Sequence, residues 1–209
     1  MDHTLPVLQT GSMPLYDIEK TYEENFAQGP FFSGDIPSRI LKPIEQWHDF
    51  LGHKVASPLG VPAGPLLNSK WTTLATNLGF DIVTYKTIRT QEHPCQPLPN
   101  IIHVETNGSL TKKRFDETLK QARRAPSSMD ELAITNSFGV PSKGPLFLLE
   151  DIEKANNAMQ EGQVMIVSIM GTNRPGDDFI SDSVRTAALA KEAGAKIVEI
   201  NFSCPNVTT

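Results

Sequence analysis

The chain has 209 residues, of which 39% are hydrophobic and 21% charged, a composition typical of a soluble globular domain with one substantial core. Its formal net charge is -5, and no block of Lys or Arg is long enough to follow a phosphate backbone, so we expect no nucleic-acid partner. The first twenty residues have neither a basic start nor a continuous apolar run, so we expect no signal peptide. No stretch approaches the ~20 apolar residues of a membrane span. Because two cysteines also give no disulfide framework, we expect a cytoplasmic protein without a membrane span.

Residues 1–53 are expected to form a leader segment. From Ile36 to Leu51, apolar residues recur at intervals of three and four, which predicts a helix with one apolar face despite Pro43. The residues of this face are Ile40, Ile44, Trp47 and Leu51. We interpret it as a helix packed on the domain, because the lack of a basic face disfavours the alternative of an amphipathic helix that docks on a membrane or a quinone.

From residue 54 onward, short apolar runs alternate with helical segments. The expected strands are 59–63, 81–86, 164–170 and 197–202. The expected helices are 69–79, 146–161 and 183–193, the first capped by Asn68 or Ser69, and they stop at Gly79, Gly162 and Gly194. This alternation predicts βαβ units and a parallel sheet.

A long insertion separates the second expected strand from the helix that begins near Leu146. It has roughly sixty residues, against the ~2 to 6 of an ordinary βα loop, so we expect it to contain structure of its own. Asn100–Glu105 and Leu132–Thr135 are the expected short strands. Because loops after the carboxyl ends of parallel strands build active sites in α/β folds, this insertion is a candidate for function.

Four short clusters follow the expected strands or lie in the insertion. Small residues at 62–65 would let a flat ring lie against the backbone, although Pro and Gly also form ordinary turns. Lys86 ends a buried strand, where a solvated charge at the rim is the simpler interpretation. In the cluster 136–141, an ordinary Asx turn is enough to explain Asn136. In the cluster 201–206, Cys204 could simply be an inert residue of the core. The five histidines show no ligand spacing, so we expect no metal site.

In this order and at these strand ends, the clusters resemble dihydroorotate dehydrogenases over residues 54–209. Ala63-Gly64 is similar to the flavin-contacting end of the family's first strand, and DIVTYKT, residues 81–87, to the strand that ends in its flavin- and substrate-binding lysine. NSFGVP, residues 136–141, resembles the substrate-binding turn, and EINFSCPN, residues 199–206, the segment that carries the catalytic base. The resemblance implies an α/β fold, a TIM (β/α)8 barrel, here only about its first four βα units, with the leader and the insertion after strand two.

The resemblance also implies FMN-dependent oxidation of dihydroorotate to orotate in pyrimidine biosynthesis, with a hydride passing to flavin N5 and a proton to Cys204 as the base. A cysteine here, rather than a serine, resembles the soluble class. The implied cofactor-binding residues are Ala63, Gly64, Lys86, Thr87, Asn136 and Asn201. The implied substrate-binding residues are Lys86, Asn136, Phe138, Gly139, Val140, Asn201 and Asn206. A lysine cation and neutral amides suit a planar anionic ligand.

Three features depart from the family pattern. Soluble members often carry asparagine where this chain has Ser142, and the leader has no counterpart in the soluble class. The chain also ends a few residues after CPN, before the glycine-rich loops and the later lysine that the family places around FMN. We therefore expect residues 54–209 to be the N-terminal half of an FMN-binding barrel, a fragment that binds FMN weakly or not at all by itself.

Several alternatives stay open at the level of sequence. The same barrel could serve a flavin reductase of another dihydropyrimidine or alkene, or a Schiff-base aldolase with Lys86 as the nucleophile. A truncated, non-catalytic fragment with an interaction role is the third alternative. The electron acceptor is open among fumarate, NAD through a partner subunit, and a quinone; a homodimer is compatible with the resemblance, since soluble relatives are commonly dimers.

Overall fold

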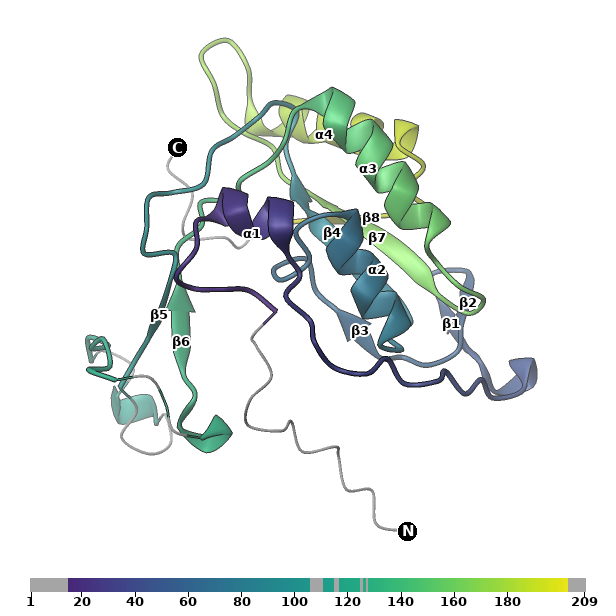
Figure 1. The fold of residues 1–209 in the computed structure, drawn as a ribbon. Helices are drawn as coiled ribbons and strands as arrows, with labels where there is room; N and C mark the ends of the chain where they lie inside the picture. The colour runs from purple at the N-terminus through teal and green to yellow at the C-terminus, as the bar shows by residue number, and fades with distance from the viewer. Residues whose placement is uncertain (1–14, 106–110, 115–116, 125, 127, 203–209) are drawn as a thin grey trace.

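The computed structural model describes residues 15–105, 111–114, 117–124, 126 and 128–202. A sheet of four parallel strands forms the centre of this part of the chain, in the order β3-β4-β7-β8 (Figure 1). The strands are β3 (Gly60–Val61), β4 (Ile82–Ile88), β7 (Val164–Ile169) and β8 (Ile197–Ile200). All four lie within the predicted strand regions or extend them by two residues at most, and their parallel arrangement confirms the predicted βαβ pattern. Among the described residues the sheet is open, with β3 and β8 at its edges.

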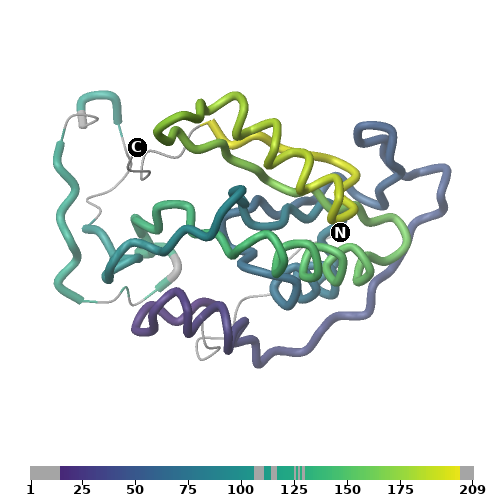
Figure 2. The backbone as a smooth tube through the Cα atoms, turned by 90° about the horizontal axis from the view of Figure 1, so that it is seen from above, coloured from purple at the N-terminus to yellow at the C-terminus, as the bar shows by residue number. Residues whose placement is uncertain are grey.

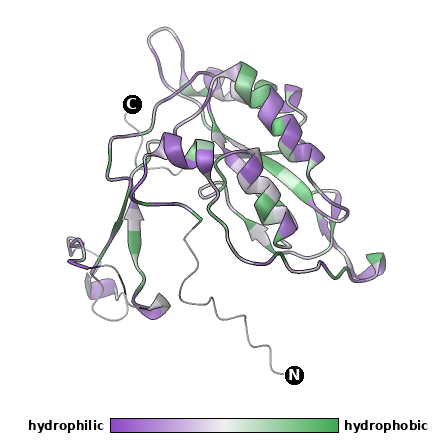
Figure 3. Ribbon diagram, in the orientation of Figure 1, coloured by the Kyte–Doolittle hydropathy of each residue, from purple (hydrophilic) through white to green (hydrophobic). Residues whose placement is uncertain are grey.

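Three helices follow the strands in sequence and pack against the sheet. They are α2 (Ser69–Asn77), α3 (Pro145–Asn157) and α4 (Phe179–Glu192). Met165 and Val167 of β7 are buried against Ile152 of α3 and Ala190 of α4 in one apolar core. Figure 3 shows β7 as a hydrophobic strand next to helices that carry both hydrophilic and hydrophobic residues. This burial of one sheet face is the main stabilising interaction of the fold.

The helix boundaries follow local capping signals. The Asn68 side chain accepts a hydrogen bond from the Lys70 N–H at the start of α2, and Gly79, with φ of 92°, follows the end of that helix. The carboxylate of Asp178 accepts from the N–H groups of Ile180 and Ser181. Because of this cap, α4 begins at Phe179, four residues before the predicted start at 183.

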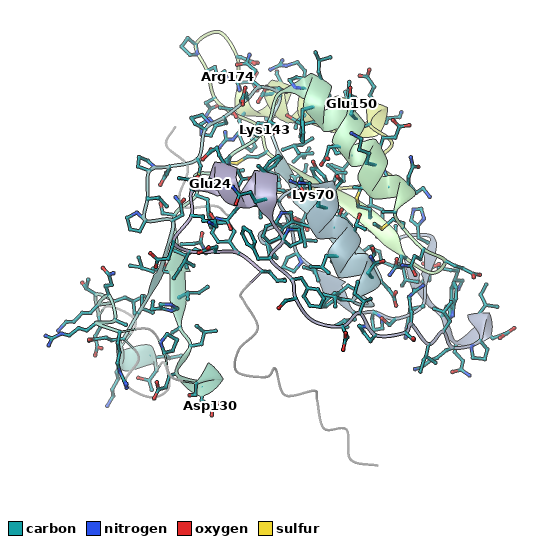
Figure 4. All side chains as sticks on the ribbon, viewed as in Figure 1. Glu24, Lys70, Asp130, Lys143, Glu150 and Arg174 are labelled. Atoms are coloured by element: carbon teal, nitrogen blue, oxygen red, sulfur yellow. The ribbon has the colours of Figure 1, made fainter. Side chains whose placement is uncertain are left out.

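The long insertion contains an antiparallel hairpin of β5 (Ile101–His103) and β6 (Ile134–Asn136), which confirms that it has its own strands. Two short 3₁₀ helices, η2 (Lys112–Arg114) and η3 (Met129–Glu131), lie at its far end, where Figure 4 labels Asp130. Figure 2 shows the insertion extending to one side of the α/β body, so only the near end of the hairpin approaches the sheet.

The helix predicted from Ile36 to residue 51 is wrong. This region is extended, with a short 3₁₀ helix η1 (Ile44–Gln46), and then enters a hairpin of β1 (His48–Phe50) and β2 (His53–Val55). The predicted apolar face is largely solvent-exposed, with Ile40 92% exposed. A helix here would lose backbone hydrogen bonds at Pro43, at a cost of about 3 kcal/mol, which outweighs the apolar periodicity.

The helix that the leader does form is α1 (Tyr22–Gln28), which the periodicity did not predict. Its start carries a complete capping box: the Thr21 side chain accepts from the Glu24 N–H, and the Glu24 carboxylate accepts from the Thr21 N–H. Figure 1 places α1 between α2 and the near end of the β5–β6 hairpin. The leader therefore packs directly beside the carboxyl ends of the strands. No helix in the described part of the chain is both long and apolar enough to cross a membrane.

Candidate active site

A cleft of about 710 Å³ lies at the carboxyl end of the parallel sheet, a volume within the ~300–1,000 Å³ typical of small-molecule sites. All the site residues predicted from sequence that the structure describes line this cleft: Ala63, Gly64, Lys86, Thr87, Asn136, Phe138, Gly139, Val140 and Asn201. The predicted base Cys204 and the predicted substrate residue Asn206 lie outside the described residues.

Parallel strands explain why residues so far apart in sequence meet here. The carboxyl ends of β3, β4 and β8 all lie at one edge of the sheet. Gly64 follows β3, Lys86 lies in β4 two residues before its end, and Asn201 follows β8 directly. Asn136 ends β6, so the β5–β6 hairpin brings the turn at 136–141 to the same edge. Lys86 and Glu199 are the charged residues among the described lining residues.

Thr87 and Asn201 form a polar floor of the cleft, and the buried hydroxyl of Ser168 contacts this floor from within the sheet. The Oγ atoms of Thr87 and Ser168 are 2.9 Å apart, and the side-chain amide of Asn201 donates to Thr87 Oγ1 over 3.3 Å. The backbone N–H of Asn201 continues the β7–β8 ladder by donating to Ile169 O. Ser168, which the sequence analysis missed, lies on the strand face opposite the apolar Val167 and Ile169, a pattern that could have identified it. Together these bonds fix how Asn201 faces the cleft.

Lys86 is half-buried near the end of β4, where its backbone N–H donates to Leu66 O over 3.1 Å. Its charge lowers the pKa of the nearby Cys95 thiol, but burial has the larger effect and, with Glu23, raises that pKa to about 11. Cys95 is therefore protonated near neutral pH and is unsuited to act as a base. It packs, partly buried, against the apolar cluster that contains Trp71 and Val83.

The turn at 136–141 has an unusual backbone. Gly139 and Val140 both have positive φ, 76° and 54°, and the second value is rare for a β-branched residue. Ser142, just after the turn, is buried and does not line the cleft: its Oγ accepts from the Arg89 N–H, and its backbone pairs with His93. Ser142, which stands where soluble family members often have asparagine, thus fixes the turn to the segment after β4.

An aromatic wall from the leader and α2 closes another side of the cleft. Tyr16 and Tyr22 both contact the Phe138 ring edge-on, with centroids 5.6 and 6.1 Å away, and Trp71 of α2 lies next to Tyr16. Burial raises the pKa of both tyrosines, so this wall is uncharged. The sequence analysis did not identify these residues, although the Thr21–Glu24 capping signature marks the helix that carries Tyr22.

A buried carboxylate ties the loops behind the cleft together. Asp182 of α4 accepts from the Thr90 hydroxyl, 2.7 Å away, and from the Thr172 N–H, 2.8 Å away, and it is also bonded to Arg185. Burial alone would raise the pKa of Asp182, but the hydrogen bonds from Thr90, Arg185 and Thr172 outweigh it and hold the pKa below its ordinary value. The loops after β4 and β7 are therefore anchored to one ionised group.

Comparison with known proteins identifies relatives of one kind, although no family model matches the chain. A dihydroorotate dehydrogenase of Dictyostelium discoideum is 48% identical over 201 residues, which are 94% of this chain and 54% of that protein. The sequence resemblance to this family is thereby confirmed, and the chain spans about half the length of this relative.

Solved structures show the same fold. Dihydroorotate dehydrogenase (DHODH) of Eimeria tenella in complex with ferulenol matches with a TM-score of 0.56 at 21% identity, over 83% of this chain and 40% of that one. The ligand-free type of the enzyme from the same organism matches with the same TM-score and identity, over 82% of this chain and 42% of that one. These matches place the chain in the α/β TIM-barrel class, while its described residues form an open parallel sheet.

Proposed function

We propose that this chain, which is similar over 94% of its length to a dihydroorotate dehydrogenase, provides the substrate- and flavin-binding cleft of an enzyme that oxidises dihydroorotate to orotate. The observation that carries this proposal is the convergence of nine predicted residues, from four separate segments of the sequence, on one cleft. The comparisons do not favour a Schiff-base aldolase or a reductase of another alkene.

The side chains around the cleft fit FMN as the cofactor. Ala63 and Gly64 present little side chain, and a Cβ added to Gly64 would meet no atom within 4 Å, so a flat ring has access to the backbone there. Thr87 and Asn201 supply a hydroxyl and an amide at the same floor, and Lys86 supplies a cation. FMN bound here would supply the acceptor for a hydride. The part of the chain described would hold and orient the ring through these residues.

The substrate and product are planar rings with a carboxylate. Lys86 provides the opposite charge for that carboxylate in a half-buried position, where an ion pair is screened less than at the surface. Asn136 and Asn201 can both donate to and accept from the ring amides without adding charge. Phe138 and the tyrosine wall restrict water on one side of the cleft. Cys204, which follows the lining residue Phe202 by two positions, is proposed as the proton acceptor.

Orotate is expected to bind the 209-residue chain at least roughly tenfold more tightly than uracil, which is the same ring without the carboxylate. A charge-assisted hydrogen bond contributes about 1.5–3 kcal/mol, and 1.4 kcal/mol corresponds to tenfold in affinity. NMR titration that follows the side-chain amides of Asn136 and Asn201 measures both affinities and locates the site. Equal affinities, or shifts confined to residues away from the cleft, would contradict the proposal.

Replacing Lys86 by methionine should weaken orotate binding roughly 30-fold, equivalent to about 2 kcal/mol, and leave uracil binding unchanged. Methionine keeps the apolar stem of the side chain and removes only the charge. Lys154→Met is the matched control, because Lys154 is a largely exposed residue of α3 and is not among the residues that line the cleft. The assignment of Lys86 fails if K86M weakens both ligands equally, or if K154M has the same effect as K86M.

A further inference from the structure

Arg89 lies three residues after Lys86 and is almost completely buried, at 2% exposure, outside the set of residues that line the cleft. Its guanidinium donates from Nε to Val140 O over 3.0 Å and from Nη2 to Gly139 O over 3.2 Å. Its third nitrogen, Nη1, donates to Thr172 Oγ1 over 2.6 Å. One planar fork therefore holds two successive carbonyls of the turn and anchors them to the loop after β7.

The orientation of the Gly139 carbonyl determines where the Val140 N–H points, whereas the peptide after Val140 has no N–H because its nitrogen belongs to Pro141. In a planar trans peptide the C=O and the N–H point in opposite directions. Because Gly139 O faces Arg89, on the side away from the cleft, the Val140 N–H points away from the guanidinium. Phe138 O accepts from the Gln96 N–H over 3.1 Å, so the Gly139 N–H points away from Gln96, which is also outside the cleft lining.

This arrangement needs a strong fixed partner. Two consecutive residues with positive φ are costly, about 1–3 kcal/mol for a non-glycine residue, and persist only where the surroundings determine them. The guanidinium is always charged, so it holds both carbonyls at any physiological pH. Behind it, Thr172 is held in turn by Asp182, which accepts from the Thr172 N–H. The turn is thus connected through Arg89 to the body of the α/β fold.

We propose that Arg89 is a positioning residue that turns the Gly139 carbonyl out of the cleft, so that the Val140 N–H is presented to an oxygen acceptor of the ligand, next to the Gly139 N–H that the Phe138–Gln96 bond orients. The inference rests on the proposed function only for the identity of that ligand, a planar carboxylate. Arg89 acts through the turn and does not itself line the cleft.

The test compares three variants of the full 209-residue chain labelled with ¹⁵N: R89M, R89K and, as a matched control, R39M. Arg39 also bridges elements, from Glu161 O to Asp81, but at the opposite end of the strands. In the ligand-free protein, R89M should shift the Gly139 and Val140 amide resonances, and orotate affinity should fall at least roughly tenfold. R39M should do neither, although it lowers the thermal midpoint. R89K keeps the charge but cannot hold both carbonyls, so it should show the same two effects to a smaller degree.

The inference is overturned if R89M binds orotate as tightly as the unmodified chain does; R89K takes its place if R89M does not fold. It is also overturned if R39M weakens orotate binding as much as R89M does. Should the unmodified chain bind no orotate, the proposed function is what fails. In that case the ligand-free spectra decide for Arg89: amide shifts at Gly139 and Val140 in the Arg89 variants alone support the positioning role, and their absence refutes it.

Discussion

Cys204→Ala is expected to slow the formation of orotate from dihydroorotate by about 100-fold or more, with orotate affinity unchanged. A positioned general base typically contributes ~10²- to 10⁴-fold to the rate, and alanine at this position would leave the substrate carbon without its proton acceptor. Because the thiolate is the basic form, the rate should also rise with pH through the thiol pKa, which is ~8.5 for a free cysteine. Turnover measured across pH, at FMN concentrations raised until the rate no longer depends on them, checks both expectations.

The other cysteine of the chain provides the matched control. Cys95 is half-buried against an apolar cluster, and burial raises its thiol pKa, so it stays protonated near neutral pH. Cys95→Ala should therefore leave both the rate and its pH dependence unchanged. If C204A turned over at the unmodified rate, or C95A lost as much activity as C204A, position 204 would not be the base.

Much of the fold and of the cleft could be predicted because their signals are local or follow from topology. Asn68 and Gly79 mark the ends of α2 by capping chemistry that depends on few neighbours. The apolar runs of β4 and β7 indicate buried parallel strands. Once parallel strands are assigned, the meeting of Lys86 and Asn201 at one edge follows from the arrangement of the sheet.

The parts that could not be predicted depend on contacts between distant segments. Tyr16 reaches Phe138, more than one hundred positions later, and no local pattern encodes that approach. Arg89 reads as a surface cation after a strand, and only the backbone of a turn fifty residues later makes its burial favourable. The helix predicted from Ile36 to Leu51 is wrong for a local reason: its apolar periodicity was given more weight than the backbone constraint of Pro43.

Asp151 accounts for the largest expected loss of stability. This buried carboxylate of α3 accepts from the Ser69 N–H over 2.8 Å, from the Ser69 hydroxyl over 2.6 Å and from the Tyr85 hydroxyl over 2.6 Å. It thereby joins α3 to the first turn of α2, where a negative charge is favourable, and to β4. Asp151→Ala would leave the Tyr85 hydroxyl, on a side chain that is 1% exposed, without this acceptor.

We expect D151A to lower the free energy of unfolding by about 3 kcal/mol, because an unsatisfied buried donor costs ~1–3 kcal/mol and at least two lose their partner. Urea unfolding measures this loss. Glu150→Ala is the control, since Glu150 lies on the outward surface of α3 (Figure 4) with only a 3.9 Å pairing to Lys154, and its effect should stay within about 0.5 kcal/mol. Tyr85→Phe should lower the free energy of unfolding less in the D151A background than in the unmodified chain, because D151A has already removed the acceptor of the Tyr85 hydroxyl. Additive losses in this double-mutant cycle, or a D151A loss no larger than that of E150A, would show that the Asp151–Tyr85 contact does not hold the helices to the sheet.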